Sequence, residues 1–168
     1  MVLLFSGKPG SGKTLSAVHY LARDKRKTIF SNVKLNIPGK EVYMFSPKKY
    51  AEIRKLRNGI VFVDEANFVF ASRFWRNIPR DILQFWAMHR KYGVDLIITS
   101  HSLKRVDIVL RELVSYDIHC RMIGAFCVNV WHDVDYDEKV KTVLFYGRKY
   151  FHMYDTLQIV QDTAYEEG

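Results

Sequence analysis

Cysteine is scarce in this chain, and long hydrophobic runs are missing. The two cysteines, Cys120 and Cys127, lack C-x-x-C spacing, so the sequence supports neither a disulfide framework nor a thiolate metal site. Both lie in predicted strands, where a cysteine acts as a small buried hydrophobe. No apolar run approaches the roughly 18 residues of a bilayer span. The opening strand also lacks the basic region and cleavage site of a signal peptide. We therefore expect a soluble, intracellular protein.

Acidic residues are also in the minority. The 168 residues include 26 Lys and Arg against 18 Asp and Glu, for a net charge of +8, and 48% are hydrophobic. This composition fits one globular domain. The charge is uneven, because the segment from Arg23 to Arg57 carries eleven basic and three acidic side chains. Such a segment favours a polyanionic partner, either nucleic acid or a membrane surface, although a solvated basic face would have the same composition.

The most informative stretch is 1–14, MVLLFSGKPGSGKT, in which a short apolar strand leads into a glycine-rich loop. The loop matches the phosphate-binding pattern G-x-x-x-x-G-K-[ST]. Its glycines let backbone N–H groups turn toward phosphate oxygens, Lys13 places a cation beside the β- and γ-phosphates, and the Thr14 hydroxyl can ligate Mg²⁺. The following helix points its positive end at the same anion. An ordinary glycine-rich turn is the alternative. The residues predicted to bind nucleotide are Gly7, Pro9, Gly10, Ser11, Gly12, Lys13, Thr14 and Leu15.

A second informative stretch is 59–66, GIVFVDEA, in which a buried strand ends in two adjacent carboxylates. It is typical of a Walker B strand. Asp64 is the expected Mg²⁺ ligand, and Glu65 is expected to orient and activate the water that attacks the γ-phosphate. Parallel β/α folds gather ligands at the C-terminal ends of their strands. The Asp-Glu order favours hydrolysis over simple binding.

The rest of the chain alternates between strand and helix patterns. Strands are predicted at 28–33, 41–45 and 94–99, and helices at 12–23, 46–56, 80–92 and 102–113. After Tyr116 a period of two predicts strands at 118–122, 126–131, 140–146 and 150–154, with a hairpin turn at 133–138. The pattern predicts an α/β P-loop NTPase fold, with a mostly parallel central sheet flanked by helices and C-terminal antiparallel strands. We expect a single domain at 1–155, including a C-terminal hairpin at about 116–155, and a tail at 156–168.

Candidates for further catalytic roles are arginines and one strand end. Arg73 and Arg76 lie among large aromatic residues, and an arginine can stabilise transition-state charge in cis or from a neighbouring subunit. Arg105 and Arg111 are alternatives, and spacing alone does not rank the four, which could equally cover surface or bind DNA phosphate. Ser100 stands where a γ-phosphate sensor is often placed, with His101 beside it. Either residue could instead cap a helix beginning at Ser102.

Several motifs together resemble the zonula occludens toxin (Zot) family, the P-loop ATPase domain of filamentous-phage assembly proteins. They are GKPGSGKT, SNVKLNIPG, VFVDEANFVFASR, W-x-x-x-P, FWAMHRKYGVDLIITSHS and YFHMYDT. The resemblance covers roughly residues 1–155, and the family is similar to FtsK/HerA-type ATPases that include viral genome-packaging motors. It implies ATP-driven movement of viral DNA by a ring of subunits, with a hexamer as one form. It assigns Lys13 and Thr14 to nucleotide and Mg²⁺, Asp64 and Glu65 to Walker B roles, and Ser100 to the sensor.

Two departures from the family shape the expectation. The family usually carries glutamine after the threonine of the fourth strand, whereas this chain has the shorter Ser100, for which His101 could substitute. Phage assembly members also commonly continue into a transmembrane segment, and this chain ends at Gly168 without one. We therefore expect a packaging or DNA-handling Mg-ATPase in the host cytoplasm, at the virion or at the inner membrane face, with capsid or assembly-complex proteins as partners.

Other functions remain open at this stage. The first is a P-loop nucleotide or small-molecule kinase, which needs an acceptor pocket and does not expect a water-activating Glu65. The second is a membrane-associated filamentous-phage assembly ATPase. The third is a nucleotide-dependent interaction protein that does not hydrolyse ATP.

Overall fold

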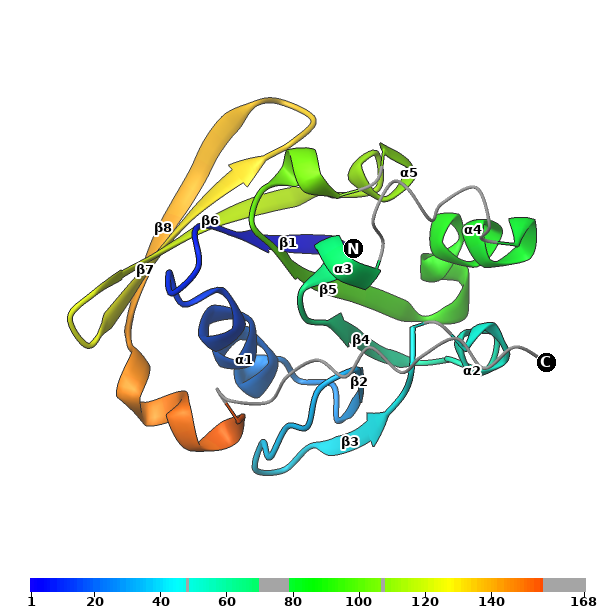
Figure 1. The fold of residues 1–168 in the computed structure, drawn as a ribbon, viewed down its shortest axis with the longest axis horizontal. Helices are drawn as coiled ribbons and strands as arrows, with labels where there is room; N and C mark the ends of the chain where they lie inside the picture. Colours follow the sequence, from blue (N-terminus) through cyan, green and yellow to red (C-terminus); the bar gives the residue numbers. More distant parts are fainter. Residues whose placement is uncertain (48, 70–78, 107, 156–168) are drawn as a thin grey trace.

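In the computed structural model, residues 1–47, 49–69, 79–106 and 108–155 are described. These described ranges form one eight-stranded sheet in the order β3-β2-β4-β5-β1-β6-β7-β8 (Figure 1). The strands are β1 (Val2–Ser6), β2 (Thr28–Ser31), β3 (Glu41–Met44), β4 (Gly59–Val63), β5 (Val94–Ser100), β6 (Tyr116–Ile123), β7 (Phe126–Asp133) and β8 (Glu138–Tyr146). The strands β1 to β6 pair in parallel, and β7 and β8 continue the sheet antiparallel.

The order of the central strands determines where the polar loops meet. Strand β5 pairs with β1 on one side and with β4 on the other, all in parallel. The C-terminal ends of these three strands therefore lie at one edge of the sheet, which is where parallel α/β folds place ligands. Each end is followed by one of the stretches that the sequence singled out.

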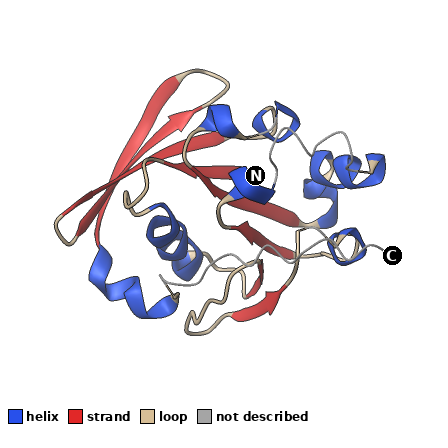
Figure 2. Ribbon diagram, viewed as in Figure 1, coloured by secondary structure: helices blue, strands red, loops and turns tan. Residues whose placement is uncertain are grey.

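Short helices cover both faces of the sheet (Figure 2). They are α1 (Lys13–Arg23), α2 (Tyr50–Ile53), α3 (Ala66–Val69), α4 (Arg80–Ala87), α5 (Ile108–Arg111) and the 3₁₀ turns η2 (His89–Tyr92), η3 (Leu103–Arg105) and η4 (Gly147–Met153). One face carries α1 and η4, and the opposite face carries α2, α3, α4 and α5 (Figure 1). Within the described ranges, none of the helices is long and apolar enough to cross a membrane.

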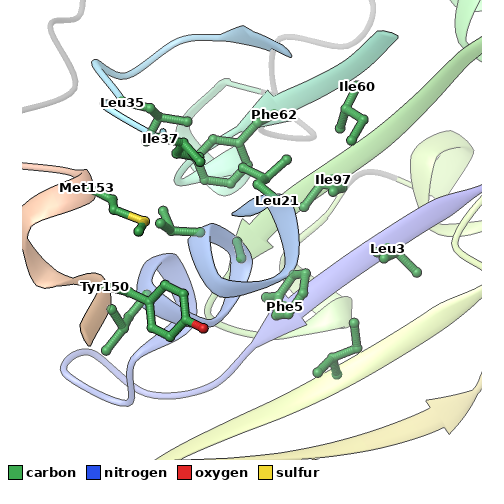
Figure 3. Close-up of a cluster of buried hydrophobic side chains, with 14 of the residues drawn as sticks. Leu3, Phe5, Leu21, Leu35, Ile37, Ile60, Phe62, Ile97, Tyr150 and Met153 are labelled. Carbon is green, nitrogen blue, oxygen red and sulfur yellow. The ribbon is translucent and has the colours of Figure 1, made fainter. Parts of the chain in front are cut away.

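Two hydrophobic cores lie on the two faces of the sheet, because neighbouring side chains along a strand point in opposite directions. In β1, Leu3 and Phe5 join the core under α1, while Val2 and Leu4 join the core under α4. Figure 3 shows α1 between buried sheet residues and the η4 residue Tyr150. The helix is therefore buried on two sides.

The structure confirms the predicted fold class, and four local predictions change. The helix predicted at 46–56 is limited to α2, since Leu56 N–H bonds to the Ile53 carbonyl in a tighter i→i−3 turn. The helix predicted at 80–92 divides into α4 and η2. The helix predicted at 102–113 is wrong, because extended backbone at Val106 separates η3 from α5.

The strand predicted at 150–154 is also wrong. Residues 150–153 belong to η4, in which Tyr150 and Met153 are both buried against α1, and Tyr154 forms only an isolated antiparallel bridge with Leu35. The separation of Tyr150 and Met153 by three residues matches the 3₁₀ repeat, whereas the sequence was interpreted with a period of two. The predicted tail at 156–168 lies outside the described residues.

Truncating Phe62 should destabilise the fold strongly. Its side chain is 0% exposed and lies at the centre of the core under α1. Phe62→Ala is expected to lower the free energy of unfolding by about 3–5 kcal/mol, through lost burial and the cavity left behind. Chemical denaturation measures the change. Phe126→Ala is the matched control, because Phe126 is 48% exposed, and an equal loss in the two variants would contradict this assignment of the core.

Candidate phosphate-binding site

The glycine-rich loop 7–14 joins β1 to α1 in a conformation that only glycine tolerates at two positions. Gly7 has φ 148° and Gly12 has φ 84°, which lie where L-residues are rarely found. A Cβ on Gly7 would come within 2.8 Å of the Cys120 carbonyl oxygen, and one on Gly12 within 2.9 Å of Met122 Cγ. The loop backbone therefore packs directly on β6, with no room for a side chain.

The N-terminus of α1 faces this loop without a side-chain cap. Gly12 is the N-cap residue and makes no side-chain hydrogen bond, and the first turn contains no acidic residue. The first N–H groups of a helix and its dipole attract an anion. Lys13 is only 5% exposed, and its ammonium donates to the Lys8 carbonyl at 3.3 Å. Cationic and N–H donors thus converge on the loop.

The predicted nucleotide-binding residues do not all present side chains to the loop. Lys13 and Thr14 do so, whereas Leu15 is buried in the core under α1. Pro9 and Gly10 are exposed at the tip of the loop, and the hydroxyl of Ser11 is buried without a hydrogen-bond partner among the described residues. Leu15 can therefore serve the site only through its backbone.

A buried carboxylate links three strand ends. Asp64 follows β4, is 9% exposed, and accepts two hydrogen bonds at the same oxygen, Oδ1. One comes from Thr14 Oγ1 in α1 at 2.9 Å and the other from Thr99 Oγ1 in β5 at 2.7 Å. The carboxylate thus joins the ends of β4 and β5 to the first turn of α1, and the stretches 7–14 and 59–66 meet directly.

Asn32, which follows β2, fixes the backbone of Asp64. Its side-chain carbonyl accepts from the Asp64 N–H at 2.8 Å, and its side-chain N–H donates to the Asp64 carbonyl at 3.1 Å. The amide thus pairs with both backbone groups of one residue, as a neighbouring strand would. The position of the carboxylate is therefore set by its own strand and by the adjacent strand end.

Burial raises the pKa of Asp64 above its ordinary value. The largest cause is the loss of solvation, which the hydrogen bonds from Thr99 and Thr14 partly offset. The neighbouring Glu65 carboxylate raises the pKa further, and the Lys13 ammonium lowers it. The ionised form of Asp64 is thus destabilised by its surroundings, and a cation beside it would relieve that cost.

Glu65 has a backbone conformation that is unusual for its residue type. Its φ is 51°, in the left-handed region that non-glycine residues seldom occupy. The Glu65 N–H donates to Thr99 Oγ1 at 2.8 Å, which holds the residue in this conformation. Glu65 Oε2 lies 3.8 Å from His101 Nε2 and has no hydrogen-bond partner among the described residues. Strained backbone of this kind concentrates at functional sites.

Ser100 and Thr99 point to opposite faces of β5. Thr99 shares the face of Ile97, under α1, and contacts Asp64 and Glu65. Ser100 is fully buried, and its hydroxyl donates to the Ser102 carbonyl at 3.3 Å. The sensor role assigned to Ser100 stays a prediction. Its neighbours Thr99 and His101 are the residues at this strand end that lie against the acidic pair. Thr99 and Asn32 were not predicted from the sequence as site residues. Side chains alternate between the two faces of β5, and this alternation already places Thr99 and Ser100 on opposite faces.

The candidate arginines have different surroundings. Arg73 and Arg76 lie outside the described residues. Arg105 is exposed, while one guanidinium nitrogen of Arg111 donates to the carbonyls of Lys104 and Val106, both at 3.0 Å. Arg111 therefore stabilises the turn before α5. No helix cap forms from the side chain of Ser102 in this part of the described chain.

This chain is an α/β protein with the P-loop NTPase fold. The class is defined by the order of the strands, by the glycine loop at a helix N-terminus and by the acids at the end of β4. The chain belongs to the zonular occludens toxin (Zot) family, whose model matches residues 1–161. This confirms the resemblance drawn from the motifs. A search of curated proteins gave no match.

Solved structures agree with the fold. The N-terminal domain of zonular occludens toxin from Neisseria meningitidis is 24% identical with a TM-score of 0.71, and the match covers 92% of this chain and 98% of that one. The genome packaging NTPase B204 of Sulfolobus turreted icosahedral virus 2, in complex with ATP-gammaS, is 14% identical with a TM-score of 0.60, over 84% and 95% of the two chains. B204 of Sulfolobus turreted icosahedral virus, a DNA-packaging ATPase, is 16% identical with a TM-score of 0.60, over the same shares.

Removing the charge of Asp64 should stabilise the free protein. Because the pKa of Asp64 is raised in the folded state, the ionised carboxylate costs stability above that pKa, and the cost disappears as the pH falls through it. Asp64→Asn keeps an oxygen for both threonine hydroxyls and is expected to raise the free energy of unfolding at pH 7. The gain should shrink as the pH is lowered toward 4.

Urea denaturation at several pH values measures this effect. Asp135→Asn in the exposed hairpin turn is the control, with an expected change within about 0.5 kcal/mol. If Asp64→Asn instead lowers the free energy of unfolding at pH 7, the ionised Asp64 is stabilised by its surroundings, and the prediction is wrong.

Proposed function

We propose that this protein is a Mg²⁺-dependent ATPase that powers the packaging, translocation or extrusion of viral DNA during virion assembly. The observation that carries the proposal is the contact between Thr14 and Asp64, which brings the glycine loop and the acidic pair into one site. ATP is the proposed nucleotide, and the ATP-gammaS complex of the similar packaging NTPase supports this choice.

In this proposal the residues of the loop bind and orient the phosphates. Loop N–H groups, the N-terminus of α1 and the Lys13 ammonium surround the anion. Glu65 orients the attacking water and accepts its proton, which an oxygen such as Oε2, without a hydrogen-bond partner among the described residues, is available to do. Thr99 positions the acidic pair, because its hydroxyl bonds both to the Asp64 side chain and to the Glu65 backbone.

The donors at the loop also fit Mg²⁺. Thr14 Oγ1 and Asp64 Oδ1 are hard oxygen atoms 2.9 Å apart, and Mg²⁺ is usually held by one or two such groups together with substrate phosphates. The cation would neutralise developing phosphate charge. Burial raises the pKa of Asp64, so a cation bound beside its carboxylate would stabilise the ionised form.

DNA and a ring of subunits complete the proposal. The family match and the likeness to genome packaging NTPases support them, as does the net charge of +8. A hexamer is one possible ring, and Arg73 or Arg76 of a neighbouring subunit would then supply charge to the phosphate. The work would take place in the host cytoplasm, at the virion or the inner membrane face, with capsid or assembly proteins as partners.

Replacing Glu65 should stop hydrolysis without stopping nucleotide binding. Glu65→Gln removes the proton acceptor and keeps the size of the side chain, so kcat for ATP is expected to fall about 10²–10⁴-fold. A phosphate-release assay and the binding of a fluorescent ATP analogue measure the two properties. Glu112→Gln, at an exposed position after α5, should retain both. Unchanged turnover in Glu65→Gln would favour an interaction protein over an ATPase.

DNA should stimulate ATP turnover if hydrolysis is coupled to movement. We expect the rate of phosphate release to rise with added DNA at low salt, and the stimulation to weaken as salt rises, because phosphate contacts release counterions. Measuring mass in solution, with and without an ATP analogue and DNA, tests the ring. A flat response to DNA at all salt concentrations would contradict the motor, and a phosphorylated acceptor would indicate a kinase instead.

A further inference from the structure

His101 directly follows β5 and lies beside Glu65, the residue that orients the attacking water in the proposed function. Its Nε2 is 3.8 Å from Glu65 Oε2, and the two side chains are only 21% and 26% exposed. Residues two apart along a strand lie on the same face, so His101 lies on the same side as Thr99, which bonds to the Glu65 backbone. The end of β5 thus approaches Glu65 at two points, its backbone and its carboxylate.

Both side chains carry a polar atom that is buried and unbonded. Glu65 Oε2 and His101 Nδ1 have no hydrogen-bond partner among the described residues. The hydroxyl of Thr99, by contrast, donates to Asp64 Oδ1 at 2.7 Å. Buried polar groups are nearly always paired, so Glu65 and His101 retain hydrogen-bonding capacity that a change at the site can satisfy.

The separation of the two side chains allows one kind of contact between them. At 3.8 Å, the Nε2 and Oε2 atoms lie beyond the ~3.2 Å limit of an ordinary N–H···O hydrogen bond. They are also too close for a bridging water, which requires two such bonds in series. The Thr99 contact fixes the backbone of Glu65, whereas its side chain rotates about several torsions. A small rotation of the carboxylate therefore forms a direct hydrogen bond with the ring.

The buried Nδ1 indicates which ring nitrogen carries the hydrogen. A neutral imidazole has one N–H donor and one acceptor nitrogen. Buried N–H groups without an acceptor are rarer than buried acceptors without a donor, and Nδ1 of His101 has no partner among the described residues. The favoured tautomer thus carries its hydrogen on Nε2, the nitrogen that lies 3.8 Å from Glu65. In this tautomer the ring is a donor on the side of the carboxylate.

We propose that His101 is a positioning residue for Glu65. In the nucleotide-bound protein, His101 Nε2–H donates to one oxygen of the Glu65 carboxylate, and the other oxygen accepts the proton of the attacking water. The hydrogen bond limits the rotation of the carboxylate and so holds the second oxygen toward the water. Glu65 has this task only if the chain hydrolyses ATP, and the role of His101 therefore rests on the proposed function.

A sensor of the γ-phosphate is the other role open to His101. Such a residue contacts the phosphate itself and acts without Glu65. The buried Nδ1 is not accessible to a phosphate, and Nε2 lies against Glu65, so the surroundings of the ring favour the positioning role. The two roles differ in a measurable way, because a positioning residue has no effect once Glu65 is replaced.

The first measurement is the steady-state hydrolysis of ATP by the full chain with DNA present. His101→Ala is expected to lower kcat about 10–10²-fold, because a misplacement of about 1 Å can cost that much. KM for ATP and the binding of a fluorescent ATP analogue should change less than about twofold. His101→Gln places an amide N–H near the position of Nε2 and should restore part of kcat, whereas the shorter His101→Asn should not. His152→Ala, at an exposed position in η4, is the matched control and should retain the kcat of the natural sequence.

A double-mutant cycle then separates the two roles. If His101 acts through Glu65, Glu65→Gln/His101→Ala should hydrolyse ATP within about twofold of Glu65→Gln alone, since the group to be positioned is already absent. Losses that multiply would show that His101 acts independently of Glu65, and they would overturn the proposal. So would an unchanged kcat in His101→Ala, or a loss confined to KM and to binding of the analogue.

Loss of the fold is measured separately, by the cooperativity of urea unfolding. If His101→Ala does not unfold cooperatively, the pair His101→Gln and His101→Asn replaces it, and equal kcat values in that pair would overturn the proposal. Failure of the proposed function gives a different result, because the natural sequence itself then releases no phosphate. Failure of the positioning role alone leaves the natural sequence active and His101→Ala equally active.

Discussion

The candidate site depends on one buried carboxylate that three strand ends hold in place. Asp64 accepts from Thr14 and Thr99 at a single oxygen, and β5, which lies between β4 and β1, places Thr99 beside both the end of β4 and the loop after β1. Burial of Asp64 destabilises its ionised carboxylate. The free protein is therefore less stable than it would be without this charge, and the same charge favours the binding of a cation.

Helix α1 is the element on which the rest of this face is built. It packs on the sheet through residues such as Leu21, and the C-terminal 3₁₀ turn η4 covers its other side. A Cβ on Gly147, where η4 begins, would lie 2.9 Å from Leu15 Cδ2, so the chain after β8 reaches α1 one residue from Thr14. The antiparallel strands are thus connected to the loop through the helix.

The sequence predicted the parts of this site that local patterns specify. The glycine loop is determined by backbone sterics at positions such as Gly12, and the buried strand before Asp64 by its apolar run, so both could be found without a structure. The alternation of β5 indicates which face Thr99 occupies, but the contacts of Thr99 and Asn32 with Asp64 come from strands that neighbour β4 only in the folded sheet. The misassigned stretch at 150–154 has a related cause, since Tyr150 and Met153 are buried at a 3₁₀ spacing only because η4 packs against α1.

The basic residues that cluster in the sequence are not all free on the surface of the folded protein. Several cations of the basic segment 23–57 are used within the fold. Arg26 pairs with Asp24 and Asp95, Lys40 donates to two backbone carbonyls, and Arg57 packs over the ring of Tyr92. Basic residues in a sequence indicate a polyanion-binding surface only where folding leaves them exposed together, and in this segment part of the positive charge is spent on contacts within the fold.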